Sequence, residues 1–286
     1  MPPLRLVIIA LLAIFAMSAV PVLVKSTAAN VVTIGIARLL IAAGVVSVIV
    51  ALSPARWRGI RPDQWRQLAV IGAVFAVHWL TYFTSIKLAT AVIAAMAIAT
   101  YGVQYLLLAW WFNGERVRWP EWLAMLVCLA GCAVMVPSFS LSNSVSLGIV
   151  VGLFSAFLYA CLPLLHQRAA ALSNLQRTWG QFSFALLCFL PLWPWSNWRL
   201  QPADVGQLVT LGLLCTVVAH GLWVKASTEL PAVFAGVIYY IYIPLAMISS
   251  SLFLNEAITP AKLLGAGMII GASTWVTLYR WRRSRL

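Results

Sequence analysis

The sequence predicts an all-α, polytopic membrane protein whose ten transmembrane helices form two inverted repeats of five helices each. Three observations lead to this fold class. The composition is too apolar for a protein that folds in water, the chain contains ten apolar runs of membrane-spanning length, and residue patterns recur about 140 positions apart.

The composition excludes most soluble classes of protein. Of the 286 residues, 63% are hydrophobic and 9% are charged, and the mean hydropathy is +0.96. A soluble domain carries roughly a quarter charged residues, so a cytosolic enzyme, a disordered chain and a secreted disulfide scaffold do not fit. The stretches between apolar runs reach only about a dozen residues. We therefore expect no soluble domain.

The apolar runs define the predicted helices. A hydrocarbon core of about 30 Å is crossed by about 20 helical residues. Ten runs of about this length follow one another along the chain, separated by short basic or turn-rich loops: 4–24, 31–52, 65–86, 91–112, 119–136, 145–165, 176–194, 205–225, 232–254 and 261–279.

The Lys and Arg residues predict how these helices are oriented. With both termini in the cytoplasm, fourteen of them face inward, and only Lys25, Lys87, Arg199 and Lys262 face outward. Short cytoplasmic loops are enriched in cations in this way. The net charge of +13 is therefore explained by topology, and we expect the lipid bilayer as a partner and no nucleic acid.

An internal duplication divides the chain into residues 1–138 and residues 145–286, called here the first and second halves. The pairs that align are Pro21 with Pro163 and His78 with His220 at an offset of 142, and Tyr101 with Tyr242 and Glu115 with Glu256 at 141. Five helices per half is an odd number, so the second half is predicted to be inserted upside down relative to the first.

Several motifs carry a family resemblance. They are Pro21 with Lys25, Arg38, the segment 253–260 (FLNEAITP) followed by Gly265 and Gly271, and its first-half counterpart Asn113, Gly114 and Glu115 followed by Gly131. In these features the whole chain resembles the drug/metabolite transporter superfamily, and within it the EamA-type ten-helix carriers. The resemblance implies a bacterial inner-membrane carrier that exports small metabolites, often amino acids. The high aromatic content is similar to that of aromatic amino-acid exporters.

The sequence departs from this family at one point. Family members often carry a proline midway along the fourth and ninth helices. Here Pro244 supplies it in the ninth helix only, and the fourth has Val103 and Gln104 instead. This departure argues against a symmetric gating mechanism.

The sequence contains no catalytic motif that would predict an enzyme. The sequence has no phosphate-binding loop of the type G-x-x-x-x-G-K-[ST], no H-E-x-x-H pair and no nucleophile with a matching base. The five cysteines lie inside apolar runs and fit no disulfide framework or metal-ligand pattern. We expect no cofactor and no bound metal.

Polar side chains inside the membrane remain as candidates for function, because they are costly in lipid and usually face a cavity or a partner. His78 and Tyr82 share one face of the third helix, with Trp79 beside them. The predicted substrate-binding residues are His78, Trp79, Tyr82 and Tyr101, with Tyr159 and Tyr242 opposite. The alternative for these residues is hydrogen bonding between packed helices.

Two further features suggest how the helices move and what they bind. Pro21 and Pro163 each remove a helix hydrogen bond, so both are predicted hinges. Arg38 lies about eight residues into the second helix. It could extend outward or pair with a backbone carbonyl, which we favour, or it could bind a substrate carboxylate.

These features together predict a transporter that exports a small, amino-acid-like metabolite by alternating access. The membrane-embedded part offers no carboxylate, so we expect transport to be uncoupled or weakly coupled to protons. The alternatives are a proton-coupled multidrug exporter and an integral-membrane scaffold that transports nothing.

Overall fold

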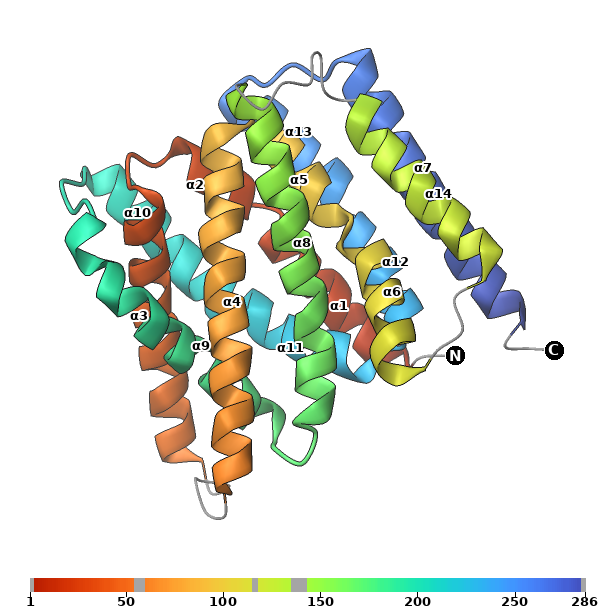
Figure 1. Ribbon diagram of the computed structural model, residues 1–286. Coiled ribbons are helices and arrows are strands. Elements are labelled where there is room, and N and C mark those ends of the chain that lie inside the picture. The colour runs from red at the N-terminus through yellow and green to blue at the C-terminus, as the bar shows by residue number, and fades with distance from the viewer. Residues whose placement is uncertain (1–2, 54–59, 115–117, 135–142, 284–286) are drawn as a thin grey trace.

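The computed structural model describes residues 3–53, 60–114, 118–134 and 143–283, and this part of the chain is helical, without a strand. Figure 1 shows one helical bundle, in which α7 (Trp119–Val134) and α14 (Pro260–Arg283) form a pair at one side. The N- and C-terminal ends lie on the same side of the bundle in this view, as an even number of membrane crossings requires.

The helices of the first half follow the apolar runs. They are α1 (Leu4–Met17), α2 (Val20–Ser26), α3 (Val31–Leu52), α4 (Pro62–Leu88), α5 (Ala91–Ala99), α6 (Tyr101–Asn113) and α7. Side-chain caps fix several helix starts: Asn30 accepts from the Thr33 backbone N–H before α3, and Thr90 accepts from Ile93 before α5.

The second half has the same order with more irregular turns. It contains α8 (Ser144–Arg168), α9 (Asn174–Phe189), the 3₁₀ helix η1 (Leu190–Trp195), α10 (Pro202–Gly212), the π-helix η2 (Leu213–Val218), α11 (Ala219–Glu229), α12 (Ala232–Tyr240), α13 (Tyr242–Leu254) and α14.

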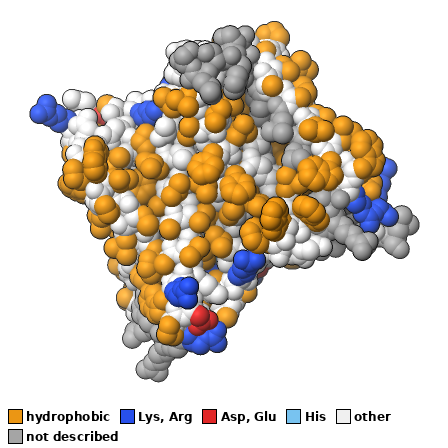
Figure 2. Space-filling view, in the orientation of Figure 1, with side chains coloured by type: hydrophobic (Ala, Val, Ile, Leu, Met, Phe, Trp, Pro, Cys, Tyr) orange, Lys and Arg blue, Asp and Glu red, His pale blue; other side chains and the backbone are white. Residues whose placement is uncertain are grey.

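Grouping these elements gives the ten predicted transmembrane segments. Within the described residues, seven segments are long and apolar enough to cross a membrane: Leu4–Ser26, Val31–Leu52, Pro62–Leu88, Ala91–Asn113, Ser144–Arg168, Pro202–Glu229 and Phe234–Leu254. Helix α7, helix α9 with η1, and helix α14 complete the ten. Figure 2 shows hydrophobic side chains over most of the visible face, with Lys and Arg near its ends, as expected of a surface in contact with lipid.

The fourth transmembrane segment of each half is broken at its middle. Helices α5 and α6 meet at Thr100, and α12 and α13 meet at Ile241. Pro244 follows the second break. At the first break, the Thr100 hydroxyl donates to the Ala97 carbonyl and accepts from the Gln104 amide. These side-chain hydrogen bonds accompany a break where no proline is present. Both segments are therefore interrupted at their middle, and whether they gate alike stays a prediction.

The two predicted hinge prolines lie in unlike surroundings. Helix α1 ends at Met17, and Pro21 is the second residue of α2. Pro163 lies inside α8, which is continuous. The first segment of the chain is therefore already broken beside its proline, whereas the sixth is not, and the role of both prolines as hinges stays a prediction.

The π-helix η2 marks an insertion in the eighth segment. Gly72 aligns with Gly212 at an offset of 140, whereas His78 aligns with His220 at 142. Helix η2 lies in this interval. Its i→i+5 turns contain more residues than α-turns, so they take up added residues without breaking the helix.

Equivalent segments of the two halves make equivalent contacts with each other. Helix α4 packs against α8, and α11 packs against α1, so the third segment of each half contacts the first segment of the other. Glycines permit the third segment of each half to approach the second segment of the other half as well: a Cβ added at Gly72 would meet Phe184 of α9, and one at Gly212 would meet Ile41 of α3. This exchange of equivalent contacts is expected for two repeats related by a pseudo-twofold axis.

Candidate functional site

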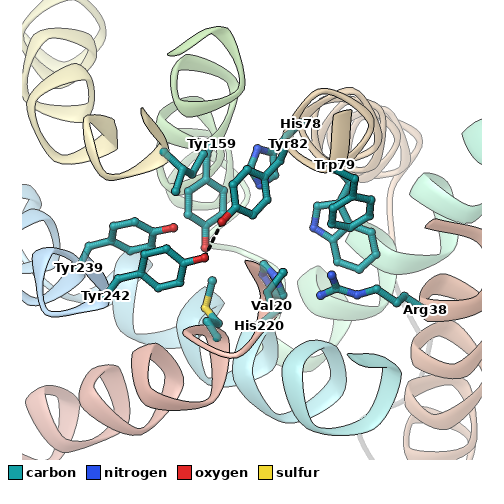
Figure 3. A pocket seen from close by; sticks show the side chains of 12 residues that line it. Val20, Arg38, His78, Trp79, Tyr82, Tyr159, His220, Tyr239 and Tyr242 are labelled. Carbon is teal, nitrogen blue, oxygen red and sulfur yellow. Dashed lines mark hydrogen bonds between the residues drawn. The ribbon is translucent and has the colours of Figure 1, made fainter. Parts of the chain in front are cut away.

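A small enclosed cavity lies between the two halves. Its volume is about 20 Å³, which is room for a water molecule but not for an amino acid. Twelve residues line it: Met17, Val20, Arg38, His78, Trp79, Tyr82, Phe83, Ile98, Tyr159, His220, Tyr239 and Tyr242. Figure 3 shows the polar ends of several of these side chains converging on one space.

His78 is held by the sixth segment. The Ser155 hydroxyl donates to the His78 backbone carbonyl over 2.8 Å, and Nδ1 of His78 lies 2.8 Å from the Ser155 hydroxyl oxygen. Because that hydroxyl already donates its proton, Nδ1 must be the donor, and Nε2 of the neutral ring is left as an acceptor. The imidazole also stacks on Tyr159, with ring centroids 4.5 Å apart.

Tyr82 and Tyr242 meet at the cavity. Their hydroxyl groups form a hydrogen bond between α4 and α13, which Figure 3 shows as a dashed line. The ring of Tyr242 is stacked with that of Tyr239, at 5.4 Å between centroids. One wall of the cavity is therefore built from tyrosines of both halves.

Tyr101 lies one layer behind this wall. Its ring centroid is 5.0 Å from that of Tyr159 and 4.8 Å from that of Tyr239. The residue is fully buried but does not line the cavity. Of the six residues predicted to bind substrate, the structure thus brings five to the cavity surface and places Tyr101 behind them.

Arg38 is the residue whose environment the sequence least anticipated. Its side chain is 0% exposed, so it does not extend outward, and no backbone carbonyl among the described residues pairs with it. Nε donates to the Thr216 hydroxyl over 3.0 Å, and the guanidinium carbon lies 4.1 Å from the centre of the Trp79 ring. The two terminal nitrogens have no hydrogen-bond partner in the described structure.

The acidic residues that the structure describes do not supply a counter-ion for Arg38. Five of the six lie in the described residues, all of them at or near helix ends. Their partners are Arg61 for Asp63, the Arg118 backbone for Glu121, Thr27 for Asp204, Lys225 for Glu229, and Ala91 for Glu256. Glu115, the sixth, lies outside the described residues.

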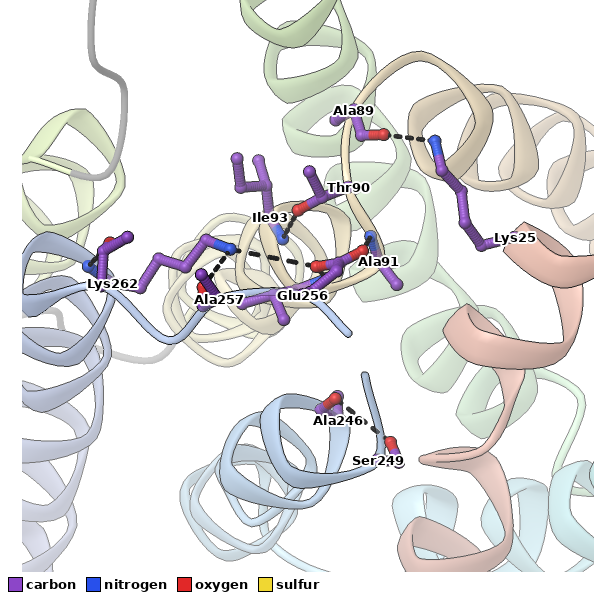
Figure 4. A network of polar contacts seen from close by, with 12 residues as sticks. Lys25, Ala89, Thr90, Ala91, Ile93, Ala246, Ser249, Glu256, Ala257 and Lys262 are labelled. Atoms are coloured by element: carbon purple, nitrogen blue, oxygen red, sulfur yellow. Dashed lines mark hydrogen bonds and ion pairs between the residues drawn. The ribbon is translucent and has the colours of Figure 1, made fainter. Parts of the chain in front are cut away.

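A second polar cluster closes one end of the bundle. Glu256 accepts from the backbone N–H groups of Ala91 and Val92 at the start of α5, and Figure 4 shows Lys262 beside the carboxylate, at 3.9 Å. Lys25 donates to the carbonyls of Ile86, Lys87 and Ala89 at the end of α4. Glu256 joins the two halves by capping a helix.

Several lining residues lie outside the predicted set. Tyr239 and His220 are intramembrane polar groups, for which the sequence left cavity lining and helix packing as open alternatives. The apolar residues Met17, Val20, Phe83 and Ile98 carry no sequence signal that separates them from lipid-facing residues. In the described part of the chain, no three His, Cys, Asp or Glu side chains are grouped so as to hold a metal ion.

Comparisons with known proteins agree with this architecture. The model of a family described as "EamA-like transporter family" matches residues 4–136 and again residues 146–278. A "Probable biotin transporter" of Pseudomonas aeruginosa is 26% identical over 237 residues, which cover 80% of this chain and 82% of the relative. An "Uncharacterized transporter YwfM" of Bacillus subtilis is 26% identical over 245 residues, covering 82% and 80%.

A solved structure shares the fold. It is described as "Crystal structure of protein" and superimposes with a TM-score of 0.73 over 97% of this chain and 98% of that chain. The sequence identity is 19%, so the likeness concerns the fold alone.

Proposed function

The chain belongs to the EamA-like transporter family and is a multi-pass membrane transporter, and from this premise we propose that it exports small, amino-acid-like metabolites by alternating access. The substrate site in this proposal is the central cavity, bounded by His78, Trp79, Tyr82, Tyr159 and Tyr242. Substrate would cross the bacterial inner membrane from the cytoplasm, where both termini are proposed to lie.

The observation that carries the proposal is the enclosed cavity between the two halves. Carriers built from inverted repeats bind solute at the repeat interface and expose it to each side in turn. The cavity volume of about 20 Å³ is smaller than the volume of an amino acid. Helices of the two halves must therefore separate to admit solute, and breaks such as the one at Thr100 provide places where segments can bend.

The chemistry of the cavity supports an amino-acid-like solute. Tyrosine and tryptophan rings offer flat apolar surfaces, and the tyrosine hydroxyls and Nε2 of His78 offer hydrogen bonds to an amino group. No Asp or Glu is among the described residues that line the cavity. This composition favours an uncoupled carrier over a proton-coupled exporter of lipophilic cations, which needs an acidic group in its pathway.

Flux through purified protein in liposomes tests the proposal. Radiolabelled phenylalanine, tryptophan, leucine and biotin would be loaded inside and their exchange followed, with protein-free liposomes as the blank. Biotin is included because one relative is named a probable biotin transporter. We expect exchange of at least one of these carboxylate-bearing solutes. Absence of exchange for every solute would favour the scaffold alternative.

A pair of variants on one helix links the flux to the cavity. Tyr159 lines the cavity, whereas Phe157, two residues earlier on α8, is 42% exposed on the outer surface. Tyr159→Ala should reduce exchange several-fold, and Phe157→Ala should leave it near the wild-type rate. Equal rates in the two variants would contradict the site.

A further inference from the structure

Arg38 is a buried cation with unused hydrogen-bonding capacity. The side chain is 0% exposed, and it lines the cavity together with His78 and Tyr82. Nε is bound to Thr216, but both terminal nitrogens lack a hydrogen-bond partner in the described residues. A buried charge and buried N–H groups without partners are costly, and proteins normally pair them.

The protein surroundings offset only part of this cost. The faces of Trp79 and Phe83 lie 4.1 Å and 5.1 Å from the guanidinium carbon, close enough for cation–π attraction. Such contacts stabilise a desolvated cation by less than the cost of burying an unpaired ion. No described carboxylate forms an ion pair with Arg38. Within the described residues, Arg38 is therefore a buried cation without an anionic partner.

The geometry around Thr216 directs the free nitrogens. Thr216 lies in η2, and its hydroxyl donates to the Leu211 carbonyl five residues earlier, a spacing that belongs to the π-helical turn. The hydroxyl oxygen is thereby free to accept from Nε of Arg38 and to hold the guanidinium by that edge. Figure 3 shows the remaining nitrogens at the inner end of the side chain, below Trp79 and toward the space between the tyrosines.

We propose that Arg38 binds the carboxylate of the transported solute, so that the substrate class is small organic monocarboxylates with an apolar or aromatic body. This inference rests on the proposed transport function. Two adjacent guanidinium nitrogens match the two oxygens of one carboxylate in a bidentate pair. No second Lys or Arg is among the described residues that line the cavity, so a doubly charged phosphate would lack a second cation. The surrounding rings would enclose the rest of the solute.

Binding of matched acid and amide pairs to the purified, detergent-solubilised protein tests this inference without requiring flux. The probes are phenylalanine with phenylalaninamide, biotin with biotinamide, and phenyl phosphate as a phosphate arm. Dissociation constants would be read from tryptophan fluorescence, since the Trp79 ring contacts the guanidinium, and checked by the shift in thermal unfolding midpoint. For the wild type we expect at least tenfold tighter binding of one acid than of its amide, and weak binding of phenyl phosphate.

Variants assign this preference to Arg38. Arg38→Gln should reduce the acid-to-amide ratio to below twofold and leave amide binding unchanged, and Arg38→Lys, which keeps a buried cation, should retain a ratio of two- to threefold. Arg199→Gln, at an exposed cation between η1 and α10, should behave as the wild type. If Arg38→Gln does not fold, the acid-to-amide binding ratio of Arg38→Lys is compared with that of the wild type. A lower ratio in Arg38→Lys supports the assignment, and an equal ratio contradicts it.

The possible outcomes separate this inference from the proposed function. A wild type that binds acids and amides alike, that binds none of the acids, or that prefers phenyl phosphate would overturn the monocarboxylate assignment. So would an unchanged preference in Arg38→Gln. Liposome flux without an acid preference would leave the transport function standing, whereas an Arg38-dependent acid preference without flux in liposomes would contradict transport and keep the anion site.

Discussion

The hydroxyl group of Tyr82 on α4 is hydrogen-bonded to that of Tyr242 on α13, so this hydrogen bond links the first half of the chain to the second at the cavity. Both side chains are buried. Any movement that opens the cavity between these helices must break this hydrogen bond. The hydrogen bond therefore stabilises the closed arrangement.

Removing either hydroxyl therefore tests the link. Tyr82→Phe and Tyr242→Phe should each cost about 1 kcal/mol, visible as a thermal midpoint lower by about 2 °C. The double variant should cost little more than either single one, because both remove the same bond. Tyr279→Phe, in α14 away from the cavity, is the control. Additive losses in the double variant would contradict a shared bond.

His78 should contribute to substrate binding through its stacked and hydrogen-bonded ring. His78→Ala removes the ring that stacks on Tyr159 and should weaken affinity about five- to tenfold, equivalent to about 1 kcal/mol. Val77→Ala, at a 43% exposed neighbour on the same helix, should bind as the wild type. Equal affinities, measured by equilibrium binding in detergent, would show that His78 only joins helices.

Tyr101 separates a packing role from a binding role. Its hydroxyl is buried and has no hydrogen-bond partner in the described structure. Because an unsatisfied hydroxyl is costly, Tyr101→Phe should leave the free energy of unfolding unchanged or raise it by about 1 kcal/mol. Denaturant titration of the wild type and of Tyr101→Phe measures the free energy of unfolding of each. If affinity for the solute falls with Tyr101→Phe, the hydroxyl reaches substrate in another state of the transport cycle.

The two prolines are predicted to act in movement more than in binding. Pro21→Ala and Pro163→Ala together should slow exchange in liposomes several-fold, with substrate affinity within about twofold, because regular helices resist bending. Pro191→Ala, in the exposed η1, serves as the control. Unchanged turnover in the double variant would exclude both residues as hinges.

Transport is expected to proceed without protons. The described cavity lining contains no acidic side chain, so a pH gradient imposed across liposomes should leave the final solute distribution at equilibrium. Solute flux and internal pH would be followed in parallel. Accumulation of solute against its gradient, driven by the pH difference, would contradict this prediction.

The fold could be predicted from the sequence because the bilayer constrains the length and composition of each helix that crosses it. A helix must cross about 30 Å of hydrocarbon with its backbone satisfied, so apolar length and charged loops reveal the segments. The interruptions within segments were not accessible. Thr100 and the π-helical turn around Thr216 lie inside predicted membrane-spanning runs, and their geometry depends on hydrogen bonds that a hydropathy pattern does not record.

The cavity could be predicted in part. Spacing on one helix placed His78 and Tyr82 on the same face. The environment of Arg38 could not be read in this way, because a missing counter-ion is a property of where all the carboxylates lie in space. Only the structure places Asp204 at Thr27 and Glu256 at Ala91, away from the guanidinium.

The packing of α4 on α8 and of α1 on α11 also affects how the protein is made. About 140 residues separate the end of α4 from the end of α11, so at roughly 5 to 20 residues per second the ribosome needs on the order of ten seconds to supply the missing neighbours. During that time the nascent first half sits in the bilayer with Arg38 lacking Thr216. We therefore expect these helices to complete their packing only after the second half has been synthesised.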